Sequence, residues 1–205
     1  MGKWDKLQAI HLDVLKEIGN IGAGNAATSL SQMIGKKIDM EVPQAAVSDL
    51  NQLVQLFGDE EEVVICISLE VTGDTPSNVF FILKEQSALQ LVDRLMGLLP
   101  GTYKEFDETA QSALQEVGNI LTGSILNAMS LMTNLNMQPS VPAFAHDMLG
   151  AVLSAALLER GYFDDKALII ETRFYDEDVV IDGYFFMLPQ VDSLGKIFNS
   201  VGVSL

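Results

Sequence analysis

Apolar residues recur at helical spacing in two long segments of the chain. In the first segment, residues 9–34, the apolar positions include Leu12, Leu15, Ile18, Ile21, Leu30 and Met33. Residues three or four apart share one face of an α-helix, so this pattern predicts one long helix. Residues 106–135 show the same spacing and predict a second long helix. Glycines inside the first helix each cost about 1 kcal/mol relative to alanine, so something other than helix propensity retains them.

The remaining patterns predict shorter elements in the same order after each long helix. In the first half these are an extended stretch with a proline at 36–47, a helix at 49–57, strands at 60–71 and 77–84, and a helix at 85–96. In the second half they are an extended stretch at 137–144, a helix at 149–159, strands at 166–175 and 179–188, and a helix at 191–198. Each half therefore has the predicted order α-β-α-β-β-α.

This repetition indicates an internal duplication within a single domain, residues 1–205, with repeats at roughly 1–101 and 102–205. The FFIL of residues 80–83 returns as FFML at 185–188, an offset of 105. A sheet built from one repeat alone would leave an edge open, so the strands of both repeats are expected in one sheet. The predicted fold class is α+β (mixed α/β), with a largely antiparallel sheet of about six strands packed by two long helices. A pseudo-two-fold axis should relate the two helices.

Each long helix also carries a polar stripe whose four members keep the same spacing. The first stripe consists of Asp13, Glu17, Asn20 and Gly24, and the second stripe of Ser112, Glu116, Asn119 and Gly123. Every member of the second stripe lies 99 positions after its counterpart. At about 100° per residue, four such positions fall within an arc of roughly 60°, so they share one helix face. A glycine one turn beyond the asparagine would let a partner surface approach closely.

Polar residues three or four apart on a helix usually form only a solvated face. A face without a function needs only to stay polar, yet both stripes retain the same acid, the same amide and the same glycine. The duplication therefore favours a duplicated functional site over two ordinary surfaces.

The charge of the chain limits the chemistry that such a site could perform. The chain has 28 acidic and 12 basic residues, which gives a formal net charge of -16. Nucleic acids and anionic membranes are bound through basic patches, so neither is an expected partner. Any phosphate chemistry would have to take its positive charge from another molecule.

The apolar runs and the single cysteine indicate a cytoplasmic protein. Runs such as residues 63–69 are far shorter than the stretch of about 20 apolar residues that spans a bilayer. The first residues lack the pattern of a signal peptide, so we expect no membrane insertion and a cytoplasmic location. Cys66 lies in a strand-like run with no arginine shortly after it, unlike the nucleophile of a cysteine-dependent phosphatase. We expect it to be a small buried residue.

Two further signals are weak. The glycines of GNIGAG, residues 19–24, superficially suggest a phosphate-binding loop, but the segment lacks the lysine of such a loop and lies inside a predicted helix. His11 and His146 are solitary, with no second ligand at a suitable spacing, so we expect no metal site.

A glutamate and an asparagine without a nearby nucleophile or metal cluster form a sparse set of chemical groups. An asparagine amide can hold a water molecule by donating and accepting hydrogen bonds. A glutamate can pair with a cation on another molecule. This combination suits a reaction in which the partner supplies the electrophile and the charge, and this chain orients a water molecule.

The pattern D/S-x3-E-x2-N-x3-G, present twice in an acidic chain, resembles the CheC family of bacterial chemotaxis phosphatases, which is related to CheX and FliY. The resemblance covers the whole chain and implies hydrolysis of the phospho-aspartate on the response regulator CheY. By this resemblance the catalytic asparagines that orient the water would be Asn20 and Asn119. The glutamates that engage the regulator, at its active-site lysine, would be Glu17 and Glu116. The expected partner-binding residues are Asp13, Gly24, Ser112 and Gly123.

The same resemblance implies the partners. The regulator would carry the magnesium ion, so we expect no cofactor on this chain. The receptor deamidase CheD would be a second partner, and two stripes in one chain make a monomer sufficient. The alternative is a non-catalytic docking module for CheY or CheD, because flagellar switch proteins related to this family use the same fold without the acid-amide pair.

Overall fold

The computed structural model describes residues 7–158, 166–176, 179–190 and 192–203. The first half contains α1 (Ala9–Ile34), β1 (Asp39–Glu41), β2 (Ala45–Asp49), α2 (Leu50–Phe57), β3 (Val63–Gly73), β4 (Ser77–Lys84) and α3 (Glu85–Leu95). The second half contains α4 (Glu108–Thr133), β5 (Met137–Pro139), β6 (Ala143–Met148), α5 (Leu149–Leu158), β7 (Lys166–Asp176), β8 (Val179–Pro189) and α6 (Ser193–Ser200). The predicted elements are confirmed, and most bounds agree within about two residues. The predicted helix ends at 159 and 191 lie outside the described residues.

Each extended stretch forms two short strands instead of one. In the first half, β1 and β2 both pair with β7, and they are separated at Pro43. In the second half, β5 and β6 both pair with β3 and are separated around Pro142. Proline has no N–H to donate to a ladder, so it interrupts each stretch.

The strands form one eight-stranded sheet, in which every described pairing is antiparallel. Six strands follow the order β1-β7-β8-β4-β3-β5, while β2 and β6 add to β7 and β3. The strands after each long helix therefore pair with a strand of the other half. The two halves are joined again at the centre, where β4 pairs with β8.

The central pair also shows that the sequence match between FFIL and FFML is wrong by one residue. Phe81 pairs with Phe185, and both belong to the larger core beneath the long helices. Phe80 lies in the smaller core on the opposite face, so it cannot be the equivalent of Phe185. An even offset, such as the 104 that separates Phe81 from Phe185, keeps equivalent residues on one face, whereas the offset of 105 exchanges the faces. A one-residue slip exchanges the two faces of a strand, which is why the sequence match misled.

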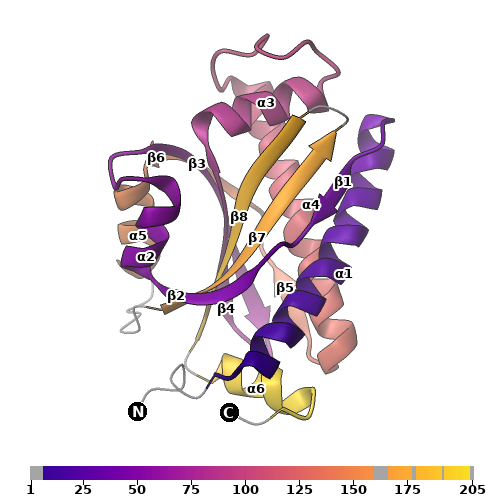
Figure 1. The fold of residues 1–205 in the computed structure, drawn as a ribbon, viewed down its shortest axis with the longest axis vertical. Coiled ribbons are helices and arrows are strands. Elements are labelled where there is room, and N and C mark those ends of the chain that lie inside the picture. The colour runs from indigo at the N-terminus through magenta and orange to yellow at the C-terminus, as the bar shows by residue number, and fades with distance from the viewer. Residues whose placement is uncertain (1–6, 159–165, 177–178, 191, 204–205) are drawn as a thin grey trace.

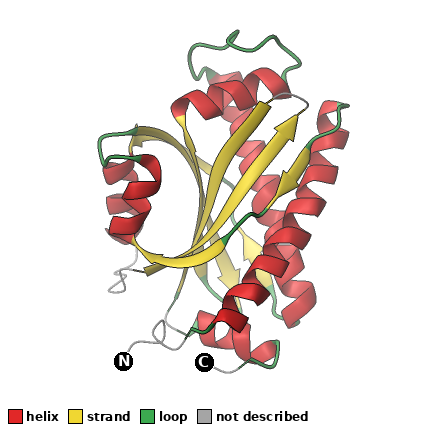
Figure 2. Cartoon of the chain, viewed as in Figure 1, coloured by secondary structure: helices red, strands yellow, loops and turns green. Residues whose placement is uncertain are grey.

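Helices cover both faces of the sheet (Figure 1; Figure 2). The long helices α1 and α4 lie side by side on one face, and residues of α3 and α6 also contribute to the core on that face. The shorter α2 and α5 cover a smaller core on the opposite face. Among the described residues, no helix is both long enough and apolar enough to cross a membrane.

Glycines on the inner faces of α1 and α4 allow close packing. A Cβ atom at Gly22 would lie 2.7 Å from the backbone of Ile125, so this glycine brings the two helices together. A Cβ atom at Gly118 would lie 2.5 Å from Ile67 of β3. Such distances leave no room for a side chain, which is why these positions tolerate the poor helix propensity of glycine. Both helices end at a residue in the left-handed conformation, Gly35 with φ 73° and Asn134 with φ 56°.

Candidate functional site

The two stripes lie on outer faces of α1 and α4. All four members of the first stripe are exposed. In the second stripe, Ser112 and Glu116 are exposed, whereas Asn119 and Gly123 are half-buried. A Cβ atom added at Gly24 or Gly123 would meet no atom within 4 Å. Each stripe therefore presents a carboxylate and an amide beside open space.

The stripe glutamates, Glu17 and Glu116, are carboxylates available to another molecule. Both side chains are exposed. Neither has an ion-pair or hydrogen-bond partner for its carboxylate within the described part of the chain. A carboxylate in this state can form a charge-assisted hydrogen bond with a cation on a partner without first losing an internal one.

The stripe asparagines differ from each other in their contacts. The backbone N–H of Val42 donates a hydrogen bond to Oδ1 of Asn20, with an N–O distance of 3.3 Å. The side chain of Asn119 makes no hydrogen bond with any residue that the structure describes. Only Asn119 therefore keeps its whole amide group available.

The loops that follow β1 and β5 explain this difference. Val42 is 2% exposed and packs where a Cβ atom of Gly19 would meet it at 3.3 Å, so its loop lies against α1. Val141, the equivalent residue at the offset of 99, is 88% exposed. Its loop is held instead by Gln115, whose Nε2 donates to the carbonyl oxygen of Pro142 at 3.1 Å. With Gln115 in that role, Asn119 is not needed to hold the loop.

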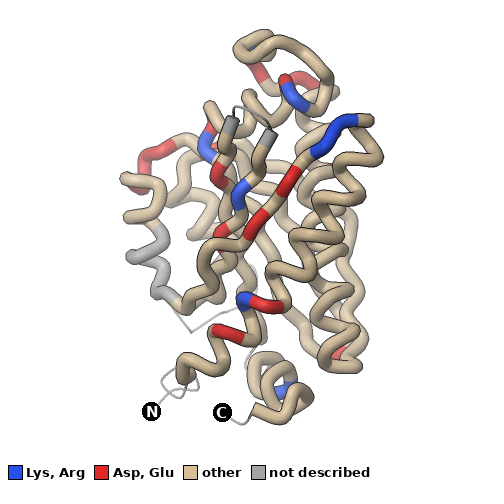
Figure 3. Tube along the Cα trace, turned by 45° about the vertical axis from the view of Figure 1, so that its right-hand side comes forward, with Lys and Arg blue, Asp and Glu red and all other residues tan. Residues whose placement is uncertain are grey.

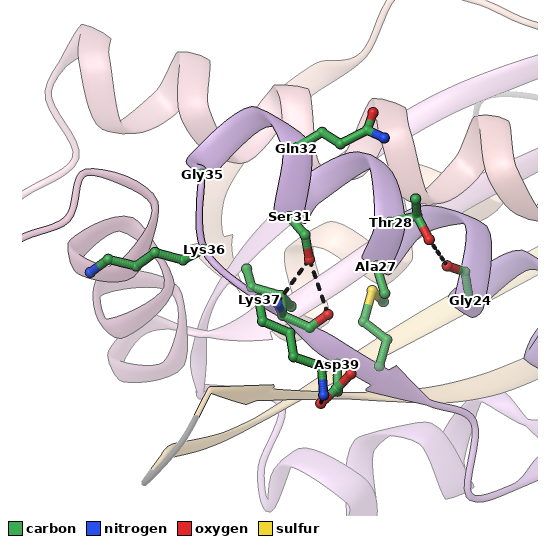
Figure 4. A pocket seen from close by; sticks show the side chains of 11 residues that line it. Gly24, Ala27, Thr28, Ser31, Gln32, Gly35, Lys36, Lys37 and Asp39 are labelled. Atoms are coloured by element: carbon green, nitrogen blue, oxygen red, sulfur yellow. Dashed lines mark hydrogen bonds and ion pairs between the residues drawn. The ribbon is translucent and has the colours of Figure 1, made fainter.

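Each stripe borders a cleft. The first stripe meets its cleft at its last member, and the second stripe meets its cleft at its first two members. Next to the first stripe, a cleft of about 600 Å³ lies between the end of α1 and β1, and Gly24 is the stripe member that lines it. Its polar groups are largely satisfied internally: Ser31 Oγ bonds the backbone of Ile38, and Lys37 pairs with Asp39 at 2.7 Å (Figure 4). Lys36 extends away from the other lining side chains in Figure 4. Next to the second stripe, a cleft of about 590 Å³ is lined by Ser112 and Glu116.

The described Lys and Arg residues do not gather beside the stripes. Figure 3 shows them at separated points of the trace, with a run where α1 leads into β1. Arg173 is partly exposed, and its Nε donates a hydrogen bond to Asp182 Oδ1 at 2.8 Å, which raises the pKa of the guanidinium. The Lys and Arg residues that the structure describes therefore form no basic patch beside the stripes that could bind a phosphate.

The cysteine and the two histidines lie away from the stripe faces. Cys66 is 3% exposed within the smaller core, so the prediction of a small buried residue is confirmed, and burial raises the pKa of its thiol to about 12. His11 is buried at the start of α1, where its Nδ1 accepts a hydrogen bond from the N–H of Gln8. His146 bonds Glu85 at 2.9 Å. Within the described ranges, no group of three or more His, Cys, Asp or Glu residues is arranged to hold a metal ion.

Comparison with known proteins connects this geometry to a family. The profile of the CheC-like family matches residues 10–46 and 110–146, the two segments that hold the stripes. Over 209 aligned residues the chain is 37% identical to the CheY-P phosphatase CheC of Bacillus subtilis (strain 168), with 100% of both chains covered. The chain belongs to the CheC-like family.

Further similarities agree with this membership. The CheC-like chain is 30% identical over 141 residues to the flagellar motor switch phosphatase FliY of Bacillus subtilis (strain 168), covering 67% of the chain and 36% of the relative. The crystal structure of Thermotoga maritima FliY superposes with a TM-score of 0.79 at 21% identity, covering 96% of this chain and 98% of the other. That likeness confirms the α+β fold predicted from the sequence.

Sequence reasoning placed the stripes of this CheC-like chain but missed the residues around them. The contact between Val42 and Asn20 joins positions 22 residues apart through a loop, and no periodicity reports it. The cleft beside the second stripe includes Met33 of α1, which belongs to the other repeat. A signal for Met33 did exist, because Met132 follows it at the offset of 99.

Proposed function

We propose that this chain is a phosphatase that hydrolyses the phospho-aspartate of the phosphorylated chemotaxis regulator CheY. The observation that carries the proposal is the full-length similarity to the CheY-P phosphatase CheC of Bacillus subtilis. The reaction adds water to phosphorus, breaks the bond between phosphorus and the aspartyl oxygen, and releases inorganic phosphate with a restored carboxylate on the regulator.

The stripe asparagines, Asn20 and Asn119, orient the attacking water in this proposal. An amide can both donate to and accept from a single water molecule, which fixes its position and its orientation. Phosphoryl transfer depends mainly on positioning and on stabilisation of charge. The half-buried, unbonded side chain of Asn119 supports this role, because its amide has no internal partner to lose within the described chain.

The stripe glutamates, Glu17 and Glu116, hold the regulator by pairing with the lysine of its phosphorylation site. Their exposure and lack of internal partners within the described residues support this role. The regulator brings the magnesium ion that neutralises the phosphate, and this chain contributes no cofactor. That division of labour agrees with a net charge of -16, because the chain does not have to bind phosphate by itself.

The remaining stripe members and a second partner complete the proposal. Asp13, Gly24, Ser112 and Gly123 form the surface against which the regulator docks. The resemblance to the CheC family adds CheD as a second protein partner of a monomeric, cytoplasmic chain. Mixing purified CheD with this chain, followed by light scattering on a sizing column, measures both the complex and the oligomeric state.

The decay of phosphorylated CheY tests the proposal. The regulator is charged with acetyl phosphate, the donor is removed, and the decay is followed with wild type, Asn20→Ala, Asn119→Ala and the double variant. We expect wild type to accelerate decay and the double variant to lose that acceleration by on the order of a hundredfold, as misplaced reacting groups do. A double variant as active as wild type would contradict water positioning. Binding without acceleration by any protein would instead identify a docking module.

A further inference from the structure

The cleft beside the second stripe is built by three helices. Met33 comes from the end of α1, Leu95 and Met96 from the end of α3, and Glu108, Thr109, Ser112, Ala113 and Glu116 from the first half of α4. Its volume is about 590 Å³. The polar part of the lining therefore includes two members of the second stripe, while the large apolar side chains come from other helices.

The two methionines of this cleft are exposed in the free chain. Met33 is 47% exposed and Met96 is 38% exposed. Leu98 and Leu99, just beyond Met96, are 39% and 80% exposed. Clustered exposed apolar side chains next to a polar site typically mark a surface that is covered in a complex. Methionine is flexible and polarizable, so it adapts to partner surfaces.

The wall that carries Met96 is held firmly in place. Asp93 of α3 is 1% exposed, and its carboxylate accepts hydrogen bonds from the N–H groups of Gly101, Thr102 and Tyr103, at 2.6, 3.2 and 2.8 Å. Its backbone carbonyl accepts another from Leu98 at 2.8 Å. These bonds fold the connection between α3 and α4 back onto α3. A binding surface fixed in this way loses little conformational freedom when a partner docks.

We propose that this cleft receives an apolar side chain of the regulator that borders its phosphorylation site. The inference rests on the proposed function, and the continuity of the cleft with Ser112 and Glu116 identifies the occupant. Glu116 lines the same cleft as Met33 and Met96, so a regulator whose lysine pairs with Glu116 also reaches these two methionines. Met33 lies on the helix that carries the first stripe. In this proposal its side chain contacts the regulator that is bound at the second stripe.

The repeat supplies a matched control for this inference. Met132 follows Met33 at the offset of 99 and is 38% exposed near the end of α4. As the counterpart of Met33 in the repeat, it corresponds to the first stripe, and it does not line the cleft beside the second stripe. A change at Met132 therefore has the same chemistry as a change at Met33 but leaves the second cleft intact.

The experiment uses full-length chains in which one stripe is inactivated. Asn20→Ala leaves the second stripe to act, and Asn119→Ala leaves the first. In the Asn20→Ala chain, Met33→Ser should raise the regulator concentration needed for half-maximal dephosphorylation roughly tenfold, with the maximal rate nearly unchanged, because burial of a methionine is lost. Met33→Leu should keep the half-maximal regulator concentration close to that of the Asn20→Ala chain, and Met132→Ser should leave this concentration unchanged. In the Asn119→Ala chain, Met33→Ser should have no effect.

The other outcomes distinguish a failure of this inference from a failure of the proposed function. An unchanged half-maximal concentration for Met33→Ser in the Asn20→Ala chain would overturn the inference while leaving the phosphatase activity established. Equal losses in both backgrounds would also overturn it, because a general loss of structure acts on both stripes. If wild type accelerates decay but neither single variant does, the stripes do not act independently and this inference is overturned while the phosphatase activity stands. If no chain accelerates decay, the proposed function fails and this inference fails with it.

Discussion

Asn20 and Asn119 occupy equivalent positions in the two stripes, yet only one of them is tied to its own chain. Oδ1 of Asn20 accepts a hydrogen bond from the N–H of Val42, whereas the side chain of Asn119 has no hydrogen-bond partner among the described residues. A water molecule held through both the donor and the acceptor of Asn20 must compete with Val42. The second stripe should therefore be the more active of the two.

The single variants Asn20→Ala and Asn119→Ala measure this difference in activity between the two stripes. A hydrogen bond contributes about 0.5–1.5 kcal/mol, so Asn119→Ala should reduce the acceleration of CheY-P decay about two- to tenfold more than Asn20→Ala does. The rates are compared at a saturating concentration of regulator, which removes differences in affinity. Equal losses, or a greater loss from Asn20→Ala, would show that the contact with Val42 does not limit the first stripe.

Asp93 is the buried carboxylate on which the connection between α3 and α4 depends. Both of its oxygens accept backbone N–H groups, so the nearly isosteric change Asp93→Asn places an NH₂ group against at least one donor. An unmade buried hydrogen bond costs about 1–3 kcal/mol, and we expect a loss of that size in the free energy of unfolding, measured with urea. The exposed Glu105→Gln serves as the control and should change the free energy of unfolding by less than about 0.5 kcal/mol.

Within a helix, the glycines divide into those that pack and those that face solvent, and α4 has one of each. A Cβ atom at Gly118 would lie 2.5 Å from Ile67, a β-branched residue that cannot easily move, whereas one at Gly123 would meet nothing within 4 Å. Gly118→Ala should lower the free energy of unfolding by about 1–3 kcal/mol through overpacking. Gly123→Ala should raise it by up to about 1 kcal/mol through better helix propensity.

The same pair of variants tests the use of the stripe face. Because Gly123→Ala adds a methyl group in the path of the regulator, it should weaken the acceleration of CheY-P decay although the chain is more stable. Urea unfolding and the decay assay are run on the same preparation. If Gly123→Ala is as active as wild type, then the regulator does not approach α4 at this position.

The elements themselves could be predicted because their signals are local. Periodic apolar residues alone gave the bounds of α1, Ala9–Ile34. Strand register could not be predicted in the same way, because β4 is buried on both faces and has no polar alternation to fix it. That is why the repeated Phe-Phe pair was matched one residue out of register.

The candidate site was predicted only in part, for a similar reason. Spacing alone placed Glu116 and Asn119 on one helix face, and both have the exposure or partial exposure that a site requires. The contacts that distinguish the two stripes depend on how the loops at Val42 and Val141 lie against the helices. Tertiary packing determines the conformation of those loops. Because both loops contain a Val-Pro pair at the same position of the repeat, the sequence does not reveal that they differ.

At the scale of the whole molecule, the two halves are interlocked through the sheet. Strands β1 and β2 of the first half pair with β7, and strands β5 and β6 of the second half pair with β3. The central β4–β8 pair joins the halves a third time. Neither half can open without breaking ladders of the other, so we expect the chain to unfold as one cooperative unit.

Cys66 of β3 is a probe for this coupling, because it is 3% exposed and burial raises the pKa of its thiol from 9.0 to about 12. At pH 8 the loss of thiolate alone slows alkylation roughly a thousandfold in the folded chain. The neutral thiol contributes its stability fully below pH 9 and loses it as the pH rises toward 12.

Substitution of a core residue in the other half then tests whether the halves open together. Phe185 of β8 is fully buried, so Phe185→Ala should cost about 3–5 kcal/mol. If the chain opens as one unit, this variant accelerates alkylation of Cys66 by the factor that its loss of unfolding free energy predicts. Leu131→Ser, at a position 75% exposed, should change neither quantity. If Phe185→Ala leaves the alkylation rate of Cys66 unchanged, then the first half opens independently, despite the exchanged strands.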